Sequence, residues 1–181
     1  MSKKLCEMTL EELWQLFPII LTEHNPCWSD WYAEEVATLK SILPYDTVYC
    51  HIGSTAVSGI MAKPIIDILI VVNSTERMKQ AACLLQSRGY IVMSTANSRI
   101  SLNKGYTENG FADRVFHLHI RLENDIDEIY FRDYLIAHHD IAKDYEQLKR
   151  RLWKQYKYDR DGYTQAKTEF VKKYTALAKQ K

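Results

Sequence analysis

The sequence lacks long apolar runs, and this excludes a membrane-spanning protein. The longest apolar stretch, Pro64 to Val72, contains Asp67 and is far too short to cross a bilayer. The N-terminal segment carries Glu7, Glu11 and Glu12, so it has no uninterrupted apolar core of the kind found in signal peptides. We therefore expect no secretion signal and no membrane partner.

The sequence also lacks paired cysteines. Its four cysteines are scattered, with no C-x-x-C pair, at Cys6, Cys27, Cys50 and Cys83. Neither a zinc ribbon nor a disulfide scaffold fits such spacing. We interpret them as small buried hydrophobic residues in a reduced compartment, which predicts a cytoplasmic location.

Charge of either sign is not in excess, because 24 basic and 23 acidic residues leave a formal net charge of +1. A dedicated nucleic-acid surface needs a net basic footprint, so nucleic acid is not expected as a partner, although a local basic pocket is compatible with the total. There is no internal repeat and no linker rich in Gly, Ser or Pro. We predict one domain over residues 1–181, with a helical extension over about 1–24 and C-terminal helices over about 129–181 packed on the core. The oligomeric state is not indicated.

Hydrophobic periodicity predicts an α+β fold. A Thr9–Glu12 capping box opens a helix that Pro18 ends, and helical spacing then runs from Trp28 to Leu43. Gly105 and Gly110 are expected to bracket a turn. The remaining patterns predict strands over 47–52, 64–72, 90–94, 98–102 and 112–122, and helices over 74–88, 130–138, 141–156 and 164–179.

A turn of small residues joins the first two strands in HIGSTAVSGIMAKPIID, His51 to Asp67. It is not a Walker A phosphate loop, because its two glycines are one residue too far apart and its lysine lies too far from the second glycine. A metal-dependent phosphoryl or nucleotidyl site fits better. The backbone of Gly53 and the hydroxyl groups of Ser54 and Thr55 would hold phosphate oxygens, and Asp67 would hold Mg²⁺. The alternative is that Asp67 accepts hydrogen bonds from the turn and only pins it.

The strand over 112–122 has two chemically different faces. Phe116, Leu118, Ile120 and Leu122 form the apolar face, and Asp113, His117, His119 and Arg121 form the polar one. Two imidazoles on one face can bind one metal ion, and imidazole suits Zn, Fe, Ni or Mn better than Mg. Solvent-facing histidines explain the pattern equally well.

Two further cations are candidate anion ligands. Lys63 could reach a phosphate as a point charge, or it could be a surface lysine at the start of a strand. Arg132 could clamp an anion if it faces the cleft, or it could pair with Asp133 at a helix end.

Several ordered motifs resemble the GrpB family. They are HIGSTAV, AKPIIDI, the Gly89-Tyr90 pair, FHLHI, FRDYL and the closing Y-x-x-x-K-x-x-F, which together extend over about residues 26–174. The resemblance implies the nucleotidyltransferase superfamily, with a mixed β-sheet flanked by helices. It places Gly53 and Ser54 at the superfamily's Gly-Ser turn and makes Asp67 the first metal carboxylate. Leu69 departs from the pattern, because a second carboxylate usually stands there, and His117 and His119 stand where a third is usual.

These observations predict a divalent-metal-dependent nucleotidyltransferase-type enzyme that acts on a nucleotide or a small phosphorylated molecule. Asp67, His117 and His119 are the candidate catalytic and metal-binding residues. The metal would be Mg²⁺ or Mn²⁺, or a transition metal. The candidate substrate-binding residues are Gly53, Ser54, Thr55, Lys63, Arg121 and Arg132. Leu69 leaves two alternatives open: a non-catalytic nucleotide- or phosphate-binding module, and a His/Asp metal hydrolase.

Overall fold

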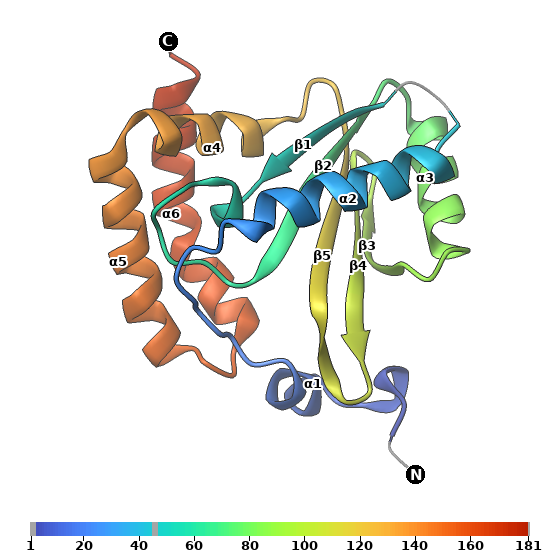
Figure 1. Ribbon diagram of the computed structural model, residues 1–181, viewed down its shortest axis with the longest axis horizontal. Coiled ribbons are helices and arrows are strands. Elements are labelled where there is room, and N and C mark those ends of the chain that lie inside the picture. The colour runs from blue at the N-terminus through green and yellow to red at the C-terminus, as the bar shows by residue number, and fades with distance from the viewer. Residues whose placement is uncertain (1–2, 45–46, 181) are drawn as a thin grey trace.

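The structure is a computed structural model that describes residues 3–44 and 47–180, so residues 1, 2 and 181 of the predicted terminal helical parts lie outside it. Its centre is a five-stranded sheet in the order β1-β2-β5-β4-β3 (Figure 1). The strands are β1 Val48–Ile52, β2 Ile65–Val72, β3 Ile91–Ala96, β4 Arg99–Thr107 and β5 Gly110–Leu122. β2 and β5 are parallel and the other pairs are antiparallel. The predicted mixed sheet is therefore confirmed.

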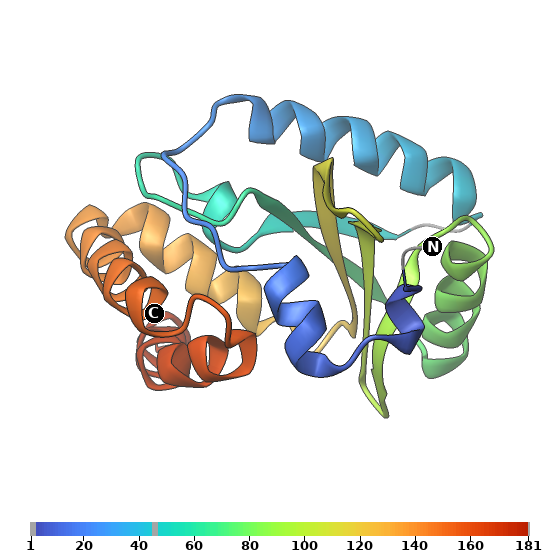
Figure 2. The same ribbon diagram turned by 90° about the horizontal axis from the view of Figure 1, so that it is seen from below.

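Helices flank this sheet on both sides (Figure 2). They are α1 Leu10–Leu16, α2 Cys27–Ile42, α3 Thr75–Gln86, α4 Asp127–Ala137, α5 His139–Gln155 and α6 Arg160–Ala178, with short 3-10 turns at Leu5–Glu7 and Ser54–Ala56. The Thr9 side chain accepts a hydrogen bond from the Glu12 amide, and the Glu12 carboxylate accepts one from Thr9, as the capping box predicts. None of the helices in the described part of the chain is both long and apolar enough to span a bilayer.

Side-chain alternation divides the sheet into an apolar face and a polar face. Ile66, Ile68 and Ile70 of β2 join Leu118 and Ile120 of β5 in the main core, where α2 and α3 cover them. Shifting β5 by one residue would bury its histidines and expose this apolar row, so the hydrophobic pattern specifies the register strongly. The opposite face carries the odd-numbered residues of both strands, and it is there that polar groups gather.

Gly105 and Gly110 lie on either side of the β4–β5 turn at residues 108–109, as expected, and Gly105 itself lies inside β4, which continues to Thr107. The pairing register shifts at Gly105, whose φ of +90° and close approach to the Arg114 backbone leave no room for a side chain. The expectation that the cysteines are buried hydrophobic residues was wrong. Cys6, Cys27 and Cys83 are exposed, and Cys50 is half-buried.

Candidate metal and anion site

The parallel pairing of β2 and β5 brings one carboxylate and two imidazoles together. Asp67 stands opposite His117, and His119 is two residues further along the same face. The Asp67 Oδ1 atom lies 3.1 Å from His119 Nε2 and 3.4 Å from His117 Nδ1. One ligand atom from each of the three residues can be chosen so that all lie within 4.8 Å of one another. This spacing suits donors that share a single metal ion.

The protonation states of this trio suit metal binding. Burial raises the pKa of Asp67, but hydrogen bonds and charges from His117 and His119 outweigh it and hold that pKa below its usual range. Burial also lowers the pKa of His117, against the opposing effect of Asp67, so its imidazole is neutral at pH 7. An ionised carboxylate and a neutral imidazole are the forms that bind metals.

Each histidine has a second partner that fixes its ring. The Tyr106 hydroxyl lies 2.8 Å from His117 Nε2, and Arg160 donates to that hydroxyl at 2.9 Å. On the other side, the Arg121 guanidinium lies 3.5 Å from His119 Nδ1. Partners of this kind orient metal-binding imidazoles in proteins.

Arg121, a predicted substrate-binding residue, lies on the polar face of β5 and makes several contacts with neighbouring groups of the protein. It is buried, and its guanidinium donates to Glu128 at 3.3 Å and to the Ile120 and Ile100 carbonyl oxygens at 3.0 and 3.3 Å. These bonds aim the guanidinium along the sheet, toward α4. Its contacts support a role in positioning His119.

The turn after β1 lies directly against Asp67. Gly53 has a φ of +73°, and a Cβ atom there would lie 2.5 Å from the Asp67 Oδ2 atom. The Ser54 hydroxyl hydrogen-bonds Tyr145 of α5, so it faces the same side. Thr55 turns the other way, because its hydroxyl donates to the Ile65 carbonyl at 3.3 Å and lies 3.0 Å from His51 Nε2. The structure thus brings Gly53 and Ser54 to Asp67 and uses Thr55 to hold the turn on the strands.

Arg132 pins the other end of this turn. Its guanidinium donates to the His51 carbonyl at 2.8 Å and pairs with Asp133 at 2.6 Å. The predicted ion pair with Asp133 is therefore present, but it lies in the middle of α4 and not at a helix end, and no described contact directs Arg132 at the Asp67 carboxylate.

Leu69 lies on the face of Asp67, as predicted, but it does not face an open cleft. It is fully buried beside Ile52 and Val71, with Ile126 and Ile129 packed against them. A carboxylate at this position would therefore be buried in an apolar cluster. α4 therefore covers the polar face of the sheet at Leu69, the next residue of β2 on that face after Asp67.

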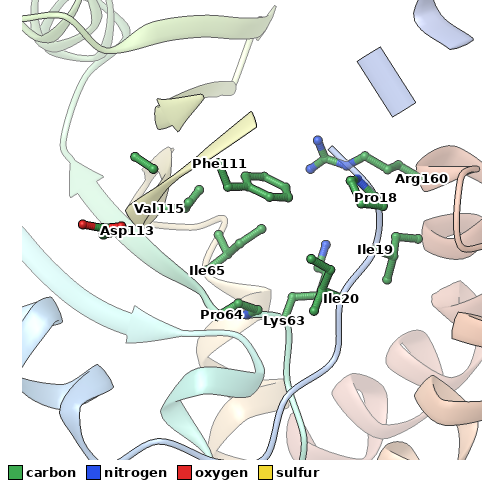
Figure 3. Close-up of a pocket in the computed structure, with 11 residues that line it drawn as sticks. Pro18, Ile19, Ile20, Lys63, Pro64, Ile65, Phe111, Asp113, Val115 and Arg160 are labelled. Atoms are coloured by element: carbon green, nitrogen blue, oxygen red, sulfur yellow. The ribbon is translucent and has the colours of Figure 1, made fainter. Parts of the chain in front are cut away.

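The structure also adds residues that the sequence patterns did not single out: Tyr106, Tyr145, Lys149, Arg160 and Lys167. Lys63, which was predicted, points with Arg160 into a cavity of about 140 Å³ beside Phe111 (Figure 3). A larger cavity of about 870 Å³ is lined by Lys63, Arg160 and His117 together with Trp14 of α1. Of the trio, His117 therefore lines a cavity whose wall also carries the cations Lys63 and Arg160.

Comparison with known proteins places the chain in a family. The sequence profile of the family described as GrpB protein matches residues 18–177. The chain belongs to the GrpB family. It is 32% identical to the glutamate-rich protein GrpB of Alkalihalophilus pseudofirmus, over 84% of this chain and 91% of that protein. It is also 32% identical to YqkA of Bacillus subtilis, over 93% of this chain but only half the length of YqkA.

Solved structures agree with this assignment and extend it to the fold. A crystal structure of the conserved protein GrpB from Enterococcus faecalis superposes with a TM-score of 0.76 at 31% identity, covering 88% of this chain and 96% of that one. The Cid1 poly(U) polymerase bound to Mg 3'-dATP superposes with a TM-score of 0.51 at 14% identity. That match covers 87% of this chain and 51% of Cid1, so it shows a nucleotidyltransferase-like fold and nothing about activity.

Proposed function

We propose that this GrpB-family chain is a metal-dependent enzyme that transfers a nucleotidyl or phosphoryl group from a nucleotide or another phosphate ester. The observation that supports it is the convergence of Asp67, His117 and His119 within 4.8 Å on neighbouring parallel strands of a nucleotidyltransferase-like sheet. Such substrates occur in the cytoplasm, which is the location the unpaired cysteines predict.

The donor set fits one divalent ion. One carboxylate and two imidazoles suit Mn²⁺, Zn²⁺ or Fe²⁺ better than Mg²⁺, which prefers oxygen ligands. Two-metal transfer needs further anionic oxygens to hold ions about 4 Å apart, and the buried Leu69 supplies none. When bound, the ion would act as a Lewis acid that withdraws charge from a phosphoryl oxygen.

The chain's own groups would orient and neutralise the substrate. The Gly53 backbone and the Ser54 hydroxyl lie beside Asp67, where they can bond phosphate oxygens, and Lys63 adds positive charge from the cavity wall. A neutral histidine that the ion leaves free can accept the proton of an attacking hydroxyl group. His117 is suited to this because Tyr106 and Arg160 hold its ring in place.

Hydrolysis of a phosphate ester is the second candidate function. It is favoured by the same donor set, since two imidazoles with one carboxylate are typical of single-metal hydrolases. Water would then replace the acceptor hydroxyl, and the roles of Gly53, Ser54 and Lys63 would be unchanged.

Metal binding is the first test. Protein freed of metal by a chelator is titrated with Mn²⁺, Zn²⁺ and Mg²⁺ in a calorimeter, beside the variants His119→Ala and His139→Ala. His139 is exposed at the start of α5, far along the chain from the trio, so it is the matched control. We expect His119→Ala to weaken binding at least about 10-fold while His139→Ala leaves it unchanged. Equal affinities in all three proteins would contradict the site.

Turnover then separates the functions. Nucleoside triphosphates are incubated with the metal-loaded protein and candidate acceptors, and the products are followed by phosphorus NMR. Acceptor-dependent release of pyrophosphate indicates nucleotidyl transfer, and acceptor-dependent release of a nucleoside diphosphate indicates phosphoryl transfer. Release of either with water alone indicates hydrolysis. Nucleotide binding without either product would mean that the fold serves as a binding module.

A further inference from the structure

Four cations gather beside the Asp67 trio, from three separate segments of the chain. Lys63 precedes β2, Lys149 lies on α5, and Arg160 and Lys167 lie on α6. We call these four residues the cation cluster. The Lys63 and Lys167 ammonium nitrogens lie 5.8 and 4.2 Å from the centre of one ring, that of Tyr163.

Aromatic rings, not carboxylates, support the other two members. The Lys149 ammonium lies 4.9 Å from the centre of the Tyr145 ring, and the Arg160 guanidinium lies 5.5 Å from that of Tyr106. Tyr145 bonds Ser54 and Tyr106 bonds His117, so both rings connect the cluster to the residues around Asp67.

No carboxylate of the described residues lies within ion-pair distance of the cluster. Lys149 is buried and donates to the Met61 carbonyl, and the nearby Glu146 is already paired with Lys143 at 3.0 Å and Arg150 at 2.9 Å. Asp67 is the acid whose charge acts on Lys63 and Lys167. It is shared with two histidines and would also bind the ion.

The cluster is therefore under electrostatic stress when no ligand is present. Burial, with repulsion from neighbouring cations, lowers the pKa of Lys63 to about 8 and that of Lys167 to about 7. Burial also lowers the pKa of Lys149 to about 7, and Lys63 adds to this effect. Contacts with the faces of aromatic rings stabilise a charged ammonium group much less than an ion pair with a carboxylate would. An anion with several charges would reduce the repulsion across the cluster and supply hydrogen-bond acceptors to Lys63 and Arg160, which line the cavities.

We infer that the cation cluster binds a phosphate chain with three or more negative charges, such as the triphosphate of a nucleotide, and directs its reacting end to Asp67, His117 and His119. This inference rests on the proposed function and specifies its substrate class. Figure 3 shows Lys63 and Arg160 directing their nitrogens into one cavity, and the larger cavity also reaches both of them and His117. A phosphate chain bound in these cavities can extend from α6 to β5.

Inorganic tripolyphosphate is the probe, because it carries the charge without a nucleoside. Calorimetric titration in the presence of a chelator measures its binding without any metal at Asp67. We expect Lys167→Met and Lys63→Met each to weaken binding at least 10-fold, and we expect binding to weaken as salt is raised. The matched control is Lys173→Met on the same helix, whose ammonium also lies over a ring, that of Tyr174 at 4.9 Å, but outside the cluster. The control should bind like the wild type.

Thermal unfolding distinguishes an anion site from a structural role. If the contact of Lys167 with Tyr163 only stabilises α6, Lys167→Met will lower the melting temperature and leave tripolyphosphate binding unchanged, which would overturn the inference. If the cluster is an anion site, the variant without ligand will melt at the same temperature as the wild type or higher, and tripolyphosphate will no longer raise that temperature.

A second arm identifies the source of the phosphate chain. Nucleoside triphosphates that bind at least as tightly as tripolyphosphate would assign the site to nucleotides, and tighter binding of tripolyphosphate would assign it to inorganic polyphosphate. Absence of tripolyphosphate binding up to 1 mM, or equal affinity in all variants, would refute the site. Because this assay contains no metal, its result does not depend on whether the trio binds an ion or catalyses transfer.

Discussion

Two groups of ionisable side chains stand side by side in this molecule and are constructed in opposite ways. Asp67, His117 and His119 come from two paired strands and bond one another, so the Asp67 carboxylate has hydrogen-bond partners within its own group. The cation cluster comes from a loop and two helices, and its members rest on aromatic rings without a paired carboxylate in the described chain. Under the proposed function, the strands would hold the ion and the C-terminal helices would recognise the substrate, so the second group depends on its ligand more than the first.

The largest effect is expected from a substitution that adds a second carboxylate next to the metal group. Leu69→Asp places a carboxylate in an apolar cluster with Ile52, Val71 and Ile129, with His119 as its cross-strand partner. We expect a loss of about 3–5 kcal/mol in the free energy of unfolding, as for other buried unpaired charges. Urea unfolding measures it, with Leu69→Met as the control that keeps the volume and should lose less than about 1.5 kcal/mol. A folded Leu69→Asp variant with tighter Mn²⁺ binding would instead show that a second carboxylate can reach the ion.

A second change should separate the two groups. Asp67→Asn removes the carboxylate of the trio, so Mn²⁺ affinity should fall at least about 100-fold, or roughly 2.7 kcal/mol. Tripolyphosphate binding without metal should stay the same or become tighter, because Asp67 is the acid that opposes an anion near Lys63 and Lys167. Asp30→Asn, at an exposed carboxylate on α2, is the control and should change neither affinity. Parallel loss of both affinities would mean that the groups form one indivisible site.

The two groups also differ in how far the sequence could predict them. Alternation in β5 was enough to place His117 and His119 on the polar face, and one carboxylate in an apolar strand identified Asp67. Pattern alone could not show that α4 covers Leu69, because that depends on how a distant helix packs. It also could not tell which hydroxyl of the turn faces Asp67, because the orientation of Thr55 is set by its hydrogen bond to the Ile65 carbonyl.

The cation cluster left weaker signals in the sequence. Lys149 interrupts the buried face of α5, where Ala142, Tyr145 and Leu152 are its neighbours at helical spacing, and a lysine at such a position indicates a special environment. Tyr163 and Lys167 are the first two residues of the Y-x-x-x-K-x-x-F motif. Neither signal shows that the lysines meet Lys63, because helix periodicity contains no information about tertiary packing.

Two glycines offer a test of how closely the turn belongs to the metal group. Gly53 and Gly59 have similar φ angles of +73° and +76°, so alanine at either should cost about 1–2 kcal/mol in backbone strain. Only at Gly53 would the new Cβ meet the Asp67 carboxylate; at Gly59 the nearest atom is a His139 carbon at 3.8 Å. We expect Gly53→Ala to lose about 1–2 kcal/mol more than Gly59→Ala and to weaken Mn²⁺ binding as well. Equal losses of stability in the two variants, with unchanged Mn²⁺ affinity, would show that the turn is not coupled to Asp67.

The last prediction is a pH dependence that should have opposite signs with and without ligand. Folding lowers the pKa of Lys149 and Lys167 to about 7, from an ordinary value near 10.5. Between pH 7 and 9 the unfolded chain therefore binds more protons than the folded chain, so the stability of the free protein should rise with pH across this window, by up to about 2 kcal/mol per lysine. A bound tripolyphosphate needs the lysines charged, so its affinity, and the stabilisation it provides, should fall over the same window.

Lys167→Met isolates the source of this dependence. The variant should show a shallower rise of stability between pH 7 and 9, because one of the lysines that release protons on folding is gone. Lys173→Met, on the same helix but outside the cluster, should keep the wild-type slope. Urea unfolding at pH 7, 8 and 9, with and without tripolyphosphate, measures both slopes. If the slopes of wild type and Lys167→Met coincide, Lys167 is not under repulsion in the folded protein, and the contrast between an internally hydrogen-bonded metal group and a stressed cation cluster does not hold.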